Sequence, residues 1–198
     1  MKTPALFLDR DGTINEEVDF LTNPDHLHLF PGVPDALRDA IKAGFKLFII
    51  TNQSGIARGL LTEHRLNEIH TALLRRLNAE QITIDRIYYC PHHPDFGEPP
   101  YRKDCSCRKP KPGMIEEAAR TFDLDLQRSF IIGDRMIDIQ TGNNIGIPSL
   151  LVLTGYGKEE WELCKQHHAT ISFVAKDLPD AIRHSRSSIP QPQPSPCS

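Results

Sequence analysis

Two aspartates separated by one residue are the first candidates for chemistry in this 198-residue chain. Asp9 and Asp11 lie in the segment DRDGT, directly after a short apolar run. A carboxylate at the first position can attack phosphorus and form an acyl phosphate, which divides one difficult displacement into two easier steps. A carboxylate at the second position can protonate the leaving oxygen and then deprotonate water. Asp- and Gly-rich turns also produce this pattern, so the chemistry requires partners elsewhere in the chain.

Four other residues, which lie later in the sequence, could help to bind a negatively charged substrate and offset its charge. Two carboxylates would repel a phosphate, and Mg²⁺ suits a site of hard oxygen ligands. Asp134 follows the apolar run FIIG and is a candidate magnesium ligand, with Asp138 one helical turn later as support. Thr51 can donate a hydroxyl hydrogen bond to the phosphoryl group, and Lys109 can stabilise the charge of a phosphoryl-transfer transition state.

A second group of residues has the composition of a zinc site. Its candidate ligands form two close pairs with twelve residues between them: Cys90 and His92, then Cys105 and Cys107. Three thiolates and one imidazole favour a closed, tetrahedral and structural zinc site. His93 is adjacent and could replace His92. We expect zinc to make the loop 90–107 rigid and to hold Arg108 and Lys109 near the active site, so that chelation lowers stability and activity together.

The alternation of apolar segments predicts an α/β fold. Apolar runs predict strands at 5–8, 46–50, 87–89, 129–132 and 149–152, and helical spacing predicts helices at 33–43, 62–77, 113–122, 137–144 and 178–184. The proline-rich stretch 90–112 predicts irregular structure. We therefore expect a Rossmann-like open parallel sheet with helices on both faces. Ligands bind such sheets beyond the carboxyl ends of the strands, where DRDGT, TNQSG and GDRMID occur.

The spacing of the motifs predicts one domain over residues 1–186 and no cap over the site. The gaps between Asp11, Thr51 and Lys109 hold only the predicted elements and the zinc loop. The site should therefore be open, with specificity set by loops. The tail 187–198 has little apolar content and is expected to be disordered.

Composition and charge exclude several classes of function. Lys and Arg total 23 and Asp and Glu total 26, for a net charge of −3, so a nucleic-acid partner is not expected. Neither a run of ~20 apolar residues nor a secretory signal is present, which predicts no membrane partner and a cytoplasmic location. An odd number of cysteines, five, favours metal ligands and free thiols over disulfides. No apolar stripe is left over, so we expect a monomer.

The segment 102–111, which begins in the zinc loop and continues beyond it, is locally basic within this acidic chain. It holds one aspartate, Asp104, against five cations: Arg102, Lys103, Arg108, Lys109 and Lys111. This favours a small, multiply anionic substrate over a mere solvated loop.

Together, DRDGT, the TNQSG threonine, the lysine of CRKPKPG and GDRMID resemble the four motifs of haloacid dehalogenase-like phosphatases. The resemblance extends to about residue 157. It implies that Asp9 is the nucleophile and Asp11 the general acid and base. It also implies that Asp9, the main-chain carbonyl of Asp11, and Asp134 hold Mg²⁺, while Thr51 and Lys109 contact the transferring phosphoryl group.

Within this superfamily, TNQSGIARG, YYCPHHP and CSCRKPKPGM resemble the D-glycero-D-manno-heptose 1,7-bisphosphate 7-phosphatase family. The resemblance implies removal of the C7 phosphate to give heptose 1-phosphate, in nucleotide-activated heptose biosynthesis for lipopolysaccharide or surface glycans. It favours His92 as the zinc ligand and Arg108 as a contact to the second phosphate. The substrate contacts that it implies, besides the catalytic residues, are Arg10, Glu17, Val18, Asp19, Phe20, Asn52, Gln53, Ser54, Arg108 and Arg135.

One departure keeps a sister family open. Many heptose phosphatases have Lys where this chain has Arg135, and GDRMIDIQ looks more like the histidinol-phosphate phosphatase of histidine biosynthesis. The longer zinc loop and SGIARG favour the heptose bisphosphate. A phosphoryl-transferring mutase would need a cap that excludes water, and a non-catalytic, zinc-stabilised binding module would leave the aspartates, Thr51 and Lys109 unexplained.

Overall fold

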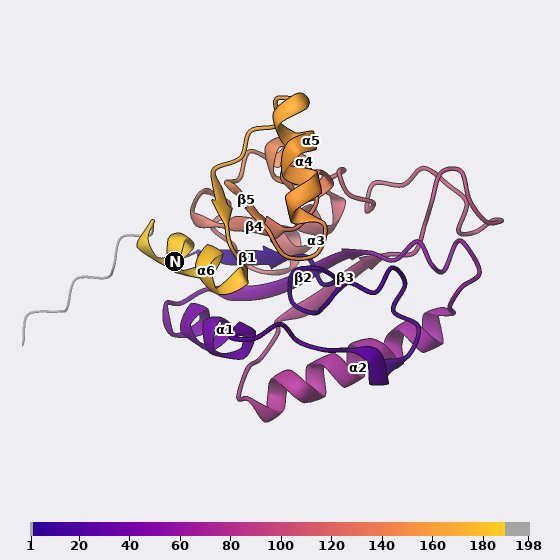
Figure 1. Cartoon of the computed structure of the whole chain (residues 1–198), viewed down its shortest axis with the longest axis horizontal. Helices are drawn as coiled ribbons and strands as arrows, with labels where there is room; N and C mark the ends of the chain where they lie inside the picture. The colour runs from indigo at the N-terminus through magenta and orange to yellow at the C-terminus, as the bar shows by residue number, and fades with distance from the viewer. Residues whose placement is uncertain (1, 189–198) are drawn as a thin grey trace, which may run out of the picture.

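Six parallel strands form one sheet in the computed structural model, which describes residues 2–188 (Figure 1). The strand order is β3-β2-β1-β4-β5-β6, and each neighbouring pair is parallel. The strands are β1 (Ala5–Leu8), β2 (Lys46–Asn52), β3 (Arg86–Cys90), β4 (Phe130–Gly133), β5 (Ser149–Val152) and β6 (Phe173–Ala175). The predicted open parallel sheet is therefore confirmed.

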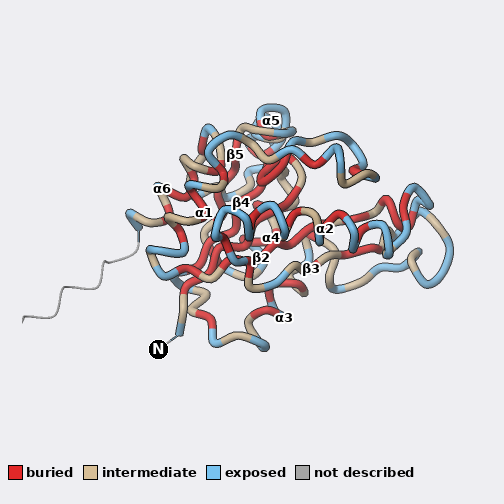
Figure 2. The backbone as a smooth tube through the Cα atoms, turned by 90° about the horizontal axis from the view of Figure 1, so that it is seen from below, coloured by how far each residue is buried: buried red, intermediate tan, exposed pale blue. Residues whose placement is uncertain are grey.

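Helices cover both faces of the sheet, because the central strands are apolar on both sides. All residues of β1, β4 and β5 are buried, and the strands run through the buried centre of the molecule (Figure 2). The helices are α1 (Val33–Lys42), α2 (Glu63–Ala79), α3 (Gly113–Thr121), α4 (Met136–Ile145), α5 (Gly157–Gln166) and α6 (Leu178–Ser187), with short 3-10 turns η1 (Pro24–His26) and η2 (Leu126–Arg128). One apolar cluster joins α1, α2 and α6 to one face of the sheet. Two other clusters join α3, α4 and α5 to the opposite face.

Local signals account for where the predicted helices begin and end. Thr62 caps α2, since its side chain accepts a hydrogen bond from the Arg65 main-chain N–H at 3.1 Å. Gly146 ends α4 in the left-handed conformation, with φ 74°. The predicted helices and strands all occur, with shifts of a few residues at their ends.

Two elements were not predicted from the sequence. In α5 only Gly157 and Cys164 are buried, so the helix carries almost no apolar stripe to reveal it. The strand β6 has three residues and lies at the edge of the sheet. The tail was predicted to begin at residue 187, but α6 ends at Ser187. The rest of the predicted tail, residues 189–198, lies outside the described residues.

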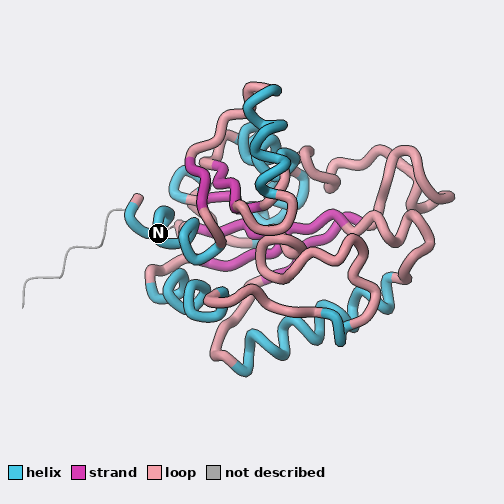
Figure 3. The backbone as a smooth tube through the Cα atoms, viewed as in Figure 1, coloured by secondary structure: helices cyan, strands magenta, loops and turns pink. Residues whose placement is uncertain are grey.

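The chain order of the strands creates the site. The chain passes from β1 to β2 and β3 on one side, then returns so that β4 pairs with β1 on the other side. The carboxyl ends of β1 and β4 therefore flank a crevice at the point where the strand order reverses. The long irregular loop after β3 projects at this end of the molecule (Figure 3). Among the described residues, no helix has the length and apolar character needed to span a membrane.

Candidate active site

A buried lysine connects two carboxylates, Asp9 after β1 and Asp138 in the first turn of α4. The Lys109 Nζ lies 2.8 Å from Asp9 Oδ1 and 2.6 Å from Asp138 Oδ1, and it donates to the Ile50 main-chain carbonyl at 2.9 Å. Burial alone would lower the pKa of Lys109, but the Asp138 and Asp9 carboxylates outweigh it and the pKa is raised. Lys109 therefore stays charged beside the candidate nucleophile.

Asp11 lies at the same edge but is held by a different set of donors. Arg10 Nη2 contacts Asp11 Oδ2 at 2.6 Å, and the side chains of Asn15 and Gln53 donate to the Asp11 carboxylate at 2.9 and 3.0 Å. Burial would raise the pKa of Asp11, but the Arg10 guanidinium and these hydrogen bonds lower it. Asp11 is therefore ionised in the free protein and must gain a proton before it can act as an acid.

The end of β2 supplies the opposite wall. Thr51 is 1% exposed and its Oγ1 accepts a hydrogen bond from Gln53 Nε2 at 2.8 Å. Asn52 holds Lys109 by two bonds of 3.1 Å, one from its Nδ2 to the Lys109 carbonyl and one to its Oδ1 from the Lys109 N–H. Asn52 therefore fixes the backbone of the loop that carries the lysine.

Asp9, Asp134 and Asp138 form a buried carboxylate cluster whose nearest oxygens lie within 4.8 Å of one another. Burial and the neighbouring carboxylates of Asp9 and Asp138 raise the pKa of Asp134 to about 8, and burial also raises that of Asp138 to about 6. The Oδ2 of Asp134 accepts the Tyr156 N–H at 2.9 Å, whereas its buried Oδ1 has no partner among the described residues. An all-oxygen set with an unpartnered oxygen fits a divalent cation such as Mg²⁺.

The backbone approaches this cluster at a position that only glycine can occupy. Gly12 has φ 78°, and a Cβ there would overlap the carboxylate of Asp134. The Gly12 carbonyl accepts the Thr154 hydroxyl at 2.6 Å, which ties the loop after β1 to the loop after β5. The glycine of DRDGT thus lets the two strand ends come together.

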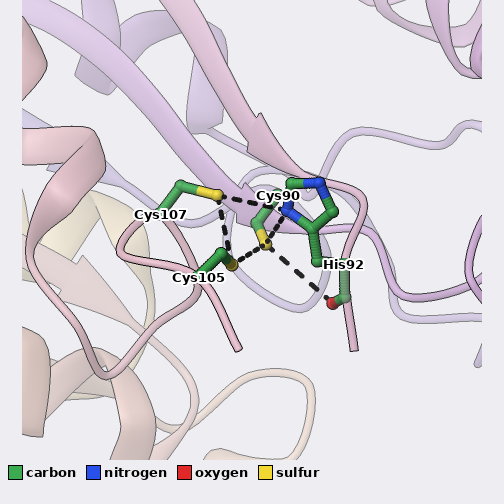
Figure 4. Close-up of side chains that lie close together, drawn as sticks. All are labelled: Cys90, His92, Cys105 and Cys107. Atoms are coloured by element: carbon green, nitrogen blue, oxygen red, sulfur yellow. Dashed lines mark hydrogen bonds between the residues drawn. The ribbon is translucent and has the colours of Figure 1, made fainter. Parts of the chain in front are cut away.

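The four predicted zinc ligands meet after β3 (Figure 4). The Sγ of Cys105 lies 3.5 Å from that of Cys90 and 3.4 Å from that of Cys107, and His92 Nδ1 lies 3.7 and 3.5 Å from Cys90 Sγ and Cys107 Sγ. Zn–S bonds of ~2.3 Å in a tetrahedron place sulfurs about 3.8 Å apart. The separations and the donor set therefore fit zinc. Cys164, outside the cluster, is a buried free thiol as predicted, and Cys197 lies outside the described residues.

A cavity of about 240 Å³ lies over the strand ends. It brings together the four predicted catalytic residues and most of the predicted substrate contacts: Glu17, Asp19, Phe20, Asn52, Gln53, Ser54, Arg108 and Arg135. Sequence reasoning missed further lining residues: Leu21, Gly55, Arg58, Leu61 and Ile137. Arg58 lies inside the TNQSGIARG segment, so that segment was the available signal.

Two predicted substrate contacts do not line this cavity. The Arg10 side chain is fully buried, pairs with Asp11 and does not line the cavity, so a substrate contact of Arg10 stays a prediction. Val18 is 41% exposed and lines a neighbouring cavity with Asp19 and Tyr156.

A side-chain network at the rim connects the β1–α1 segment to the loop after β5. The Arg135 guanidinium lies 4.1 Å from the ring centroid of Tyr156, whose hydroxyl donates to Asp19 Oδ1 at 2.7 Å. Arg135 Nη2 also lies 3.9 Å from Glu17 Oε2. Burial and the Asp11 charge raise the pKa of Glu17 to about 7. Tyr156, which the sequence did not single out, thus helps to orient Arg135.

The parallel sheet with two carboxylates after its first strand is the arrangement of haloacid dehalogenase-like hydrolases. A family model described as HAD-hydrolase-like matches residues 106–181. This match covers the C-terminal part of the chain, and the relatives described next confirm the predicted superfamily and show that the protein is a phosphoric monoester hydrolase.

Comparison with known proteins narrows this class. The chain is 39% identical over 184 residues to D-glycero-D-manno-heptose-1,7-bisphosphate 7-phosphatase of Chlorobaculum tepidum. This match covers 90% of this chain and 92% of that protein. The chain is 42% identical over 182 residues to D-glycero-beta-D-manno-heptose-1,7-bisphosphate 7-phosphatase of Escherichia coli strain K12, covering 91% and 94%. The chain belongs to the heptose-1,7-bisphosphate 7-phosphatase family.

A solved structure agrees with these relatives. D,D-heptose 1,7-bisphosphate phosphatase from B. bronchiseptica, complexed with magnesium and phosphate, matches with a TM-score of 0.82 and 34% identity, covering 94% of this chain and 99% of that chain. The histidinol-phosphate alternative is not favoured by these similarities.

Proposed function

We propose that this protein hydrolyses the C7 phosphate of D-glycero-D-manno-heptose 1,7-bisphosphate to heptose 1-phosphate, in the synthesis of nucleotide-activated heptose. The observation that carries the proposal is Asp9, held by the buried Lys109 beneath an open cavity whose rim carries Arg108 and Arg135. A site with cations both at its floor and at its rim suits a substrate with two phosphates. The names of the relatives support the heptose as the sugar.

Asp9 and Asp11 divide the reaction into two displacements. An oxygen of Asp9 attacks the C7 phosphorus, the bond from phosphorus to the C7 oxygen breaks, and Asp11 gives a proton to that oxygen. Asp11 takes this proton from solvent when the substrate binds, because the negative charge of the phosphate opposes the lowering of the Asp11 pKa by Arg10. In the second step Asp11 takes a proton from water, which attacks the phosphorus of the acyl phosphate. Phosphate leaves and Asp9 is restored.

Two further residues hold the transferring group. Thr51 at the end of β2 can donate its hydroxyl hydrogen to a phosphoryl oxygen, since Gln53 already donates to the Thr51 oxygen. Lys109 balances the charge that develops on phosphorus. Its position does not depend on the substrate, because Asp138 and Asn52 hold it.

A magnesium ion is proposed at the carboxylate cluster. Asp9, Asp134 and the main-chain carbonyl of Asp11 would hold it, and the unpartnered Oδ1 of Asp134 supports this assignment. When bound, the ion supplies positive charge that offsets the repulsion between the carboxylates and the phosphate. Burial and the neighbouring negative charges raise the pKa of Asp134 to about 8 and so favour its protonated form. A bound cation would displace that proton.

A structural zinc ion is proposed at Cys90, His92, Cys105 and Cys107. We expect one zinc per chain by elemental analysis of the purified protein. After treatment with a chelator, removal of the chelator and readdition of Mg²⁺, the protein should have a Tm at least ~5 °C lower and a lower activity, because the zinc would join the two ends of the loop. Cys164→Ser should keep its zinc. Protein without zinc, or with an unchanged Tm after its removal, would contradict the assignment.

A substrate panel tests the proposed function. We expect kcat/KM for one anomer of heptose 1,7-bisphosphate to exceed that for histidinol phosphate and fructose 1,6-bisphosphate by at least ~100-fold, about 2.7 kcal/mol of differential transition-state binding. A preference for histidinol phosphate would move the protein to the sister activity. Comparable values for all substrates would make it a general phosphatase.

We also propose that the protein acts as a monomer with a single catalytic domain in the cytoplasm. No disulfide joins the four cysteines of the described part of the chain, which suits a reducing compartment. A molecular mass measured in solution tests the monomer, and twice the chain mass of 22.4 kDa would contradict it.

A further inference from the structure

Arg58 lies where three separate segments meet at the cavity rim. It belongs to the loop between β2 and α2, and it lines the cavity. Its guanidinium carbon lies 3.6 Å from the ring centroid of Phe96, in the zinc loop, and 6.0 Å from that of Phe20, in the segment after β1. An aromatic face attracts a guanidinium and holds its plane, while its N–H edge stays free to donate.

The support under Arg58 is closely packed. A Cβ at Gly97 would overlap the main-chain carbonyl of Ala57, so the zinc loop approaches the Arg58 loop backbone to backbone. The Phe96 ring also packs edge to face against His93, with centroids 4.6 Å apart. Arg58 is thus an exposed side chain on a fixed platform, and the zinc loop forms part of that platform.

Arg58 differs from the other cationic side chains of the cavity in whether its N–H donors have partners within the protein. Lys109 is held by two carboxylates and a main-chain carbonyl. Arg108 donates to the main-chain carbonyl of His92 at 3.1 Å, and Arg135 lies 3.9 Å from a carboxylate. The Arg58 guanidinium makes no hydrogen bond or ion pair with any residue in the described range 2–188, and only the main-chain N–H of Arg58 is bonded, to the Ser54 carbonyl at 3.0 Å. A positioned guanidinium with five unused N–H donors fits an external oxyanion.

We infer that Arg58 binds the phosphate that is not removed and so makes the enzyme prefer bisphosphates to monophosphates. The inference rests on the proposed function, because it requires a substrate with a second phosphate. Asp9 acts at the bottom of the cavity, and Arg58 lies at its rim among loops, so a substrate with phosphates at opposite ends can reach both. Arg58 is then a specificity-determining residue whose binding energy is available only to a substrate with two phosphates.

The test measures one ratio: kcat/KM for heptose 1,7-bisphosphate divided by kcat/KM for D-glycero-D-manno-heptose 7-phosphate, which lacks the distal phosphate. Arg58→Ala should lower this ratio by ~10- to 100-fold, as expected for the loss of charge-assisted hydrogen bonds. Arg58→Lys should recover part of it, and Phe96→Leu should lower it by a smaller factor. The exposed Arg75→Ala on α2 is the matched control and should keep the wild-type ratio.

The outcomes separate the inference from the proposed function. A wild-type protein that does not hydrolyse the bisphosphate overturns both. A wild-type protein that hydrolyses it, together with an unchanged ratio in Arg58→Ala, overturns only the role of Arg58. An equal loss of kcat/KM on both substrates also leaves the ratio unchanged. It would assign Arg58 to the structure of its loop, and a lower Tm of the Arg58→Ala variant would show this.

Discussion

Replacing Asp9 with Asn is expected to lower kcat for phosphate release by at least ~10⁴-fold. The amide has nearly the shape of the carboxylate, but its oxygen is a far weaker nucleophile and cannot form the acyl phosphate. The buried pair of Lys109 and Asp138 stays intact in this variant, so the protein should fold. Phosphate release with and without Asp9 is the direct measurement.

Beryllium fluoride, which mimics a phosphoryl group bound to a carboxylate, gives an independent test of whether Asp9 is the nucleophile. In the wild-type protein with Mg²⁺, the fluoride mimic should attach to Asp9 and give a ¹⁹F signal that Asp9→Asn lacks. The exposed Asp25→Asn, in η1, is the matched control and should keep both activity and signal. Turnover within ~10-fold of wild type in Asp9→Asn would contradict the assignment of the nucleophile. A wild-type protein without turnover would revive the binding-module alternative.

The sequence predicts the floor of the site well, for a topological reason. Asp9, Thr51 and Asp134 each follow or end a buried strand, and parallel strands bring their carboxyl ends to one edge. Closely spaced ligands with the right chemistry predict the cluster at Cys90 and Cys105 equally well. In both cases a short sequence motif is sufficient to predict the site, because the fold class determines where the residues of that motif lie.

The rim of the site could not be predicted in the same way. The stacking of Arg58 on Phe96 joins two loops 38 positions apart, and no local pattern reports such a contact. The hydrogen bond between Tyr156 and Asp19 likewise joins residues 137 positions apart in the sequence. The burial of the Arg10 side chain against Asp11 also could not be predicted from the segment DRDGT alone. Such tertiary contacts form the rim, which explains why Arg58 and Tyr156 were missed in the sequence while the residues at the floor were singled out.

Replacing Lys109 with Met is expected to affect both stability and catalysis. Met keeps most of the volume, but it leaves the carboxylates of Asp9 and Asp138 without their cation. Breaking a buried ion pair on one side costs ~3–5 kcal/mol of unfolding free energy. Loss of the charge that stabilises the transferring phosphoryl group should lower kcat by ~10²- to 10³-fold. Urea unfolding and phosphate release measure the two effects.

The loss of stability should depend on pH in a definite direction. Burial already raises the pKa of Asp138 to about 6, and removing Lys109 raises it further because Lys109 favours the ionised form. A carboxyl group whose pKa is higher in the folded than in the unfolded protein destabilises the fold increasingly as pH rises from about 4 through the folded value. Lys109→Met should therefore be less destabilised at pH 5.5 than at pH 8.

A second substitution separates the structural role of Lys109 from its catalytic one. Lys109→Met combined with Asp138→Asn removes a buried charge and should recover part of the stability at pH 8, while kcat stays low because the cation beside Asp9 is still missing. Lys111→Met, two residues away and exposed, is the matched control and should change neither quantity by much. If Lys109→Met unfolds like the wild type at pH 8, the buried pair is not what holds this loop. If the double variant recovers activity, Lys109 acts only by neutralising Asp138 and not on the phosphoryl group.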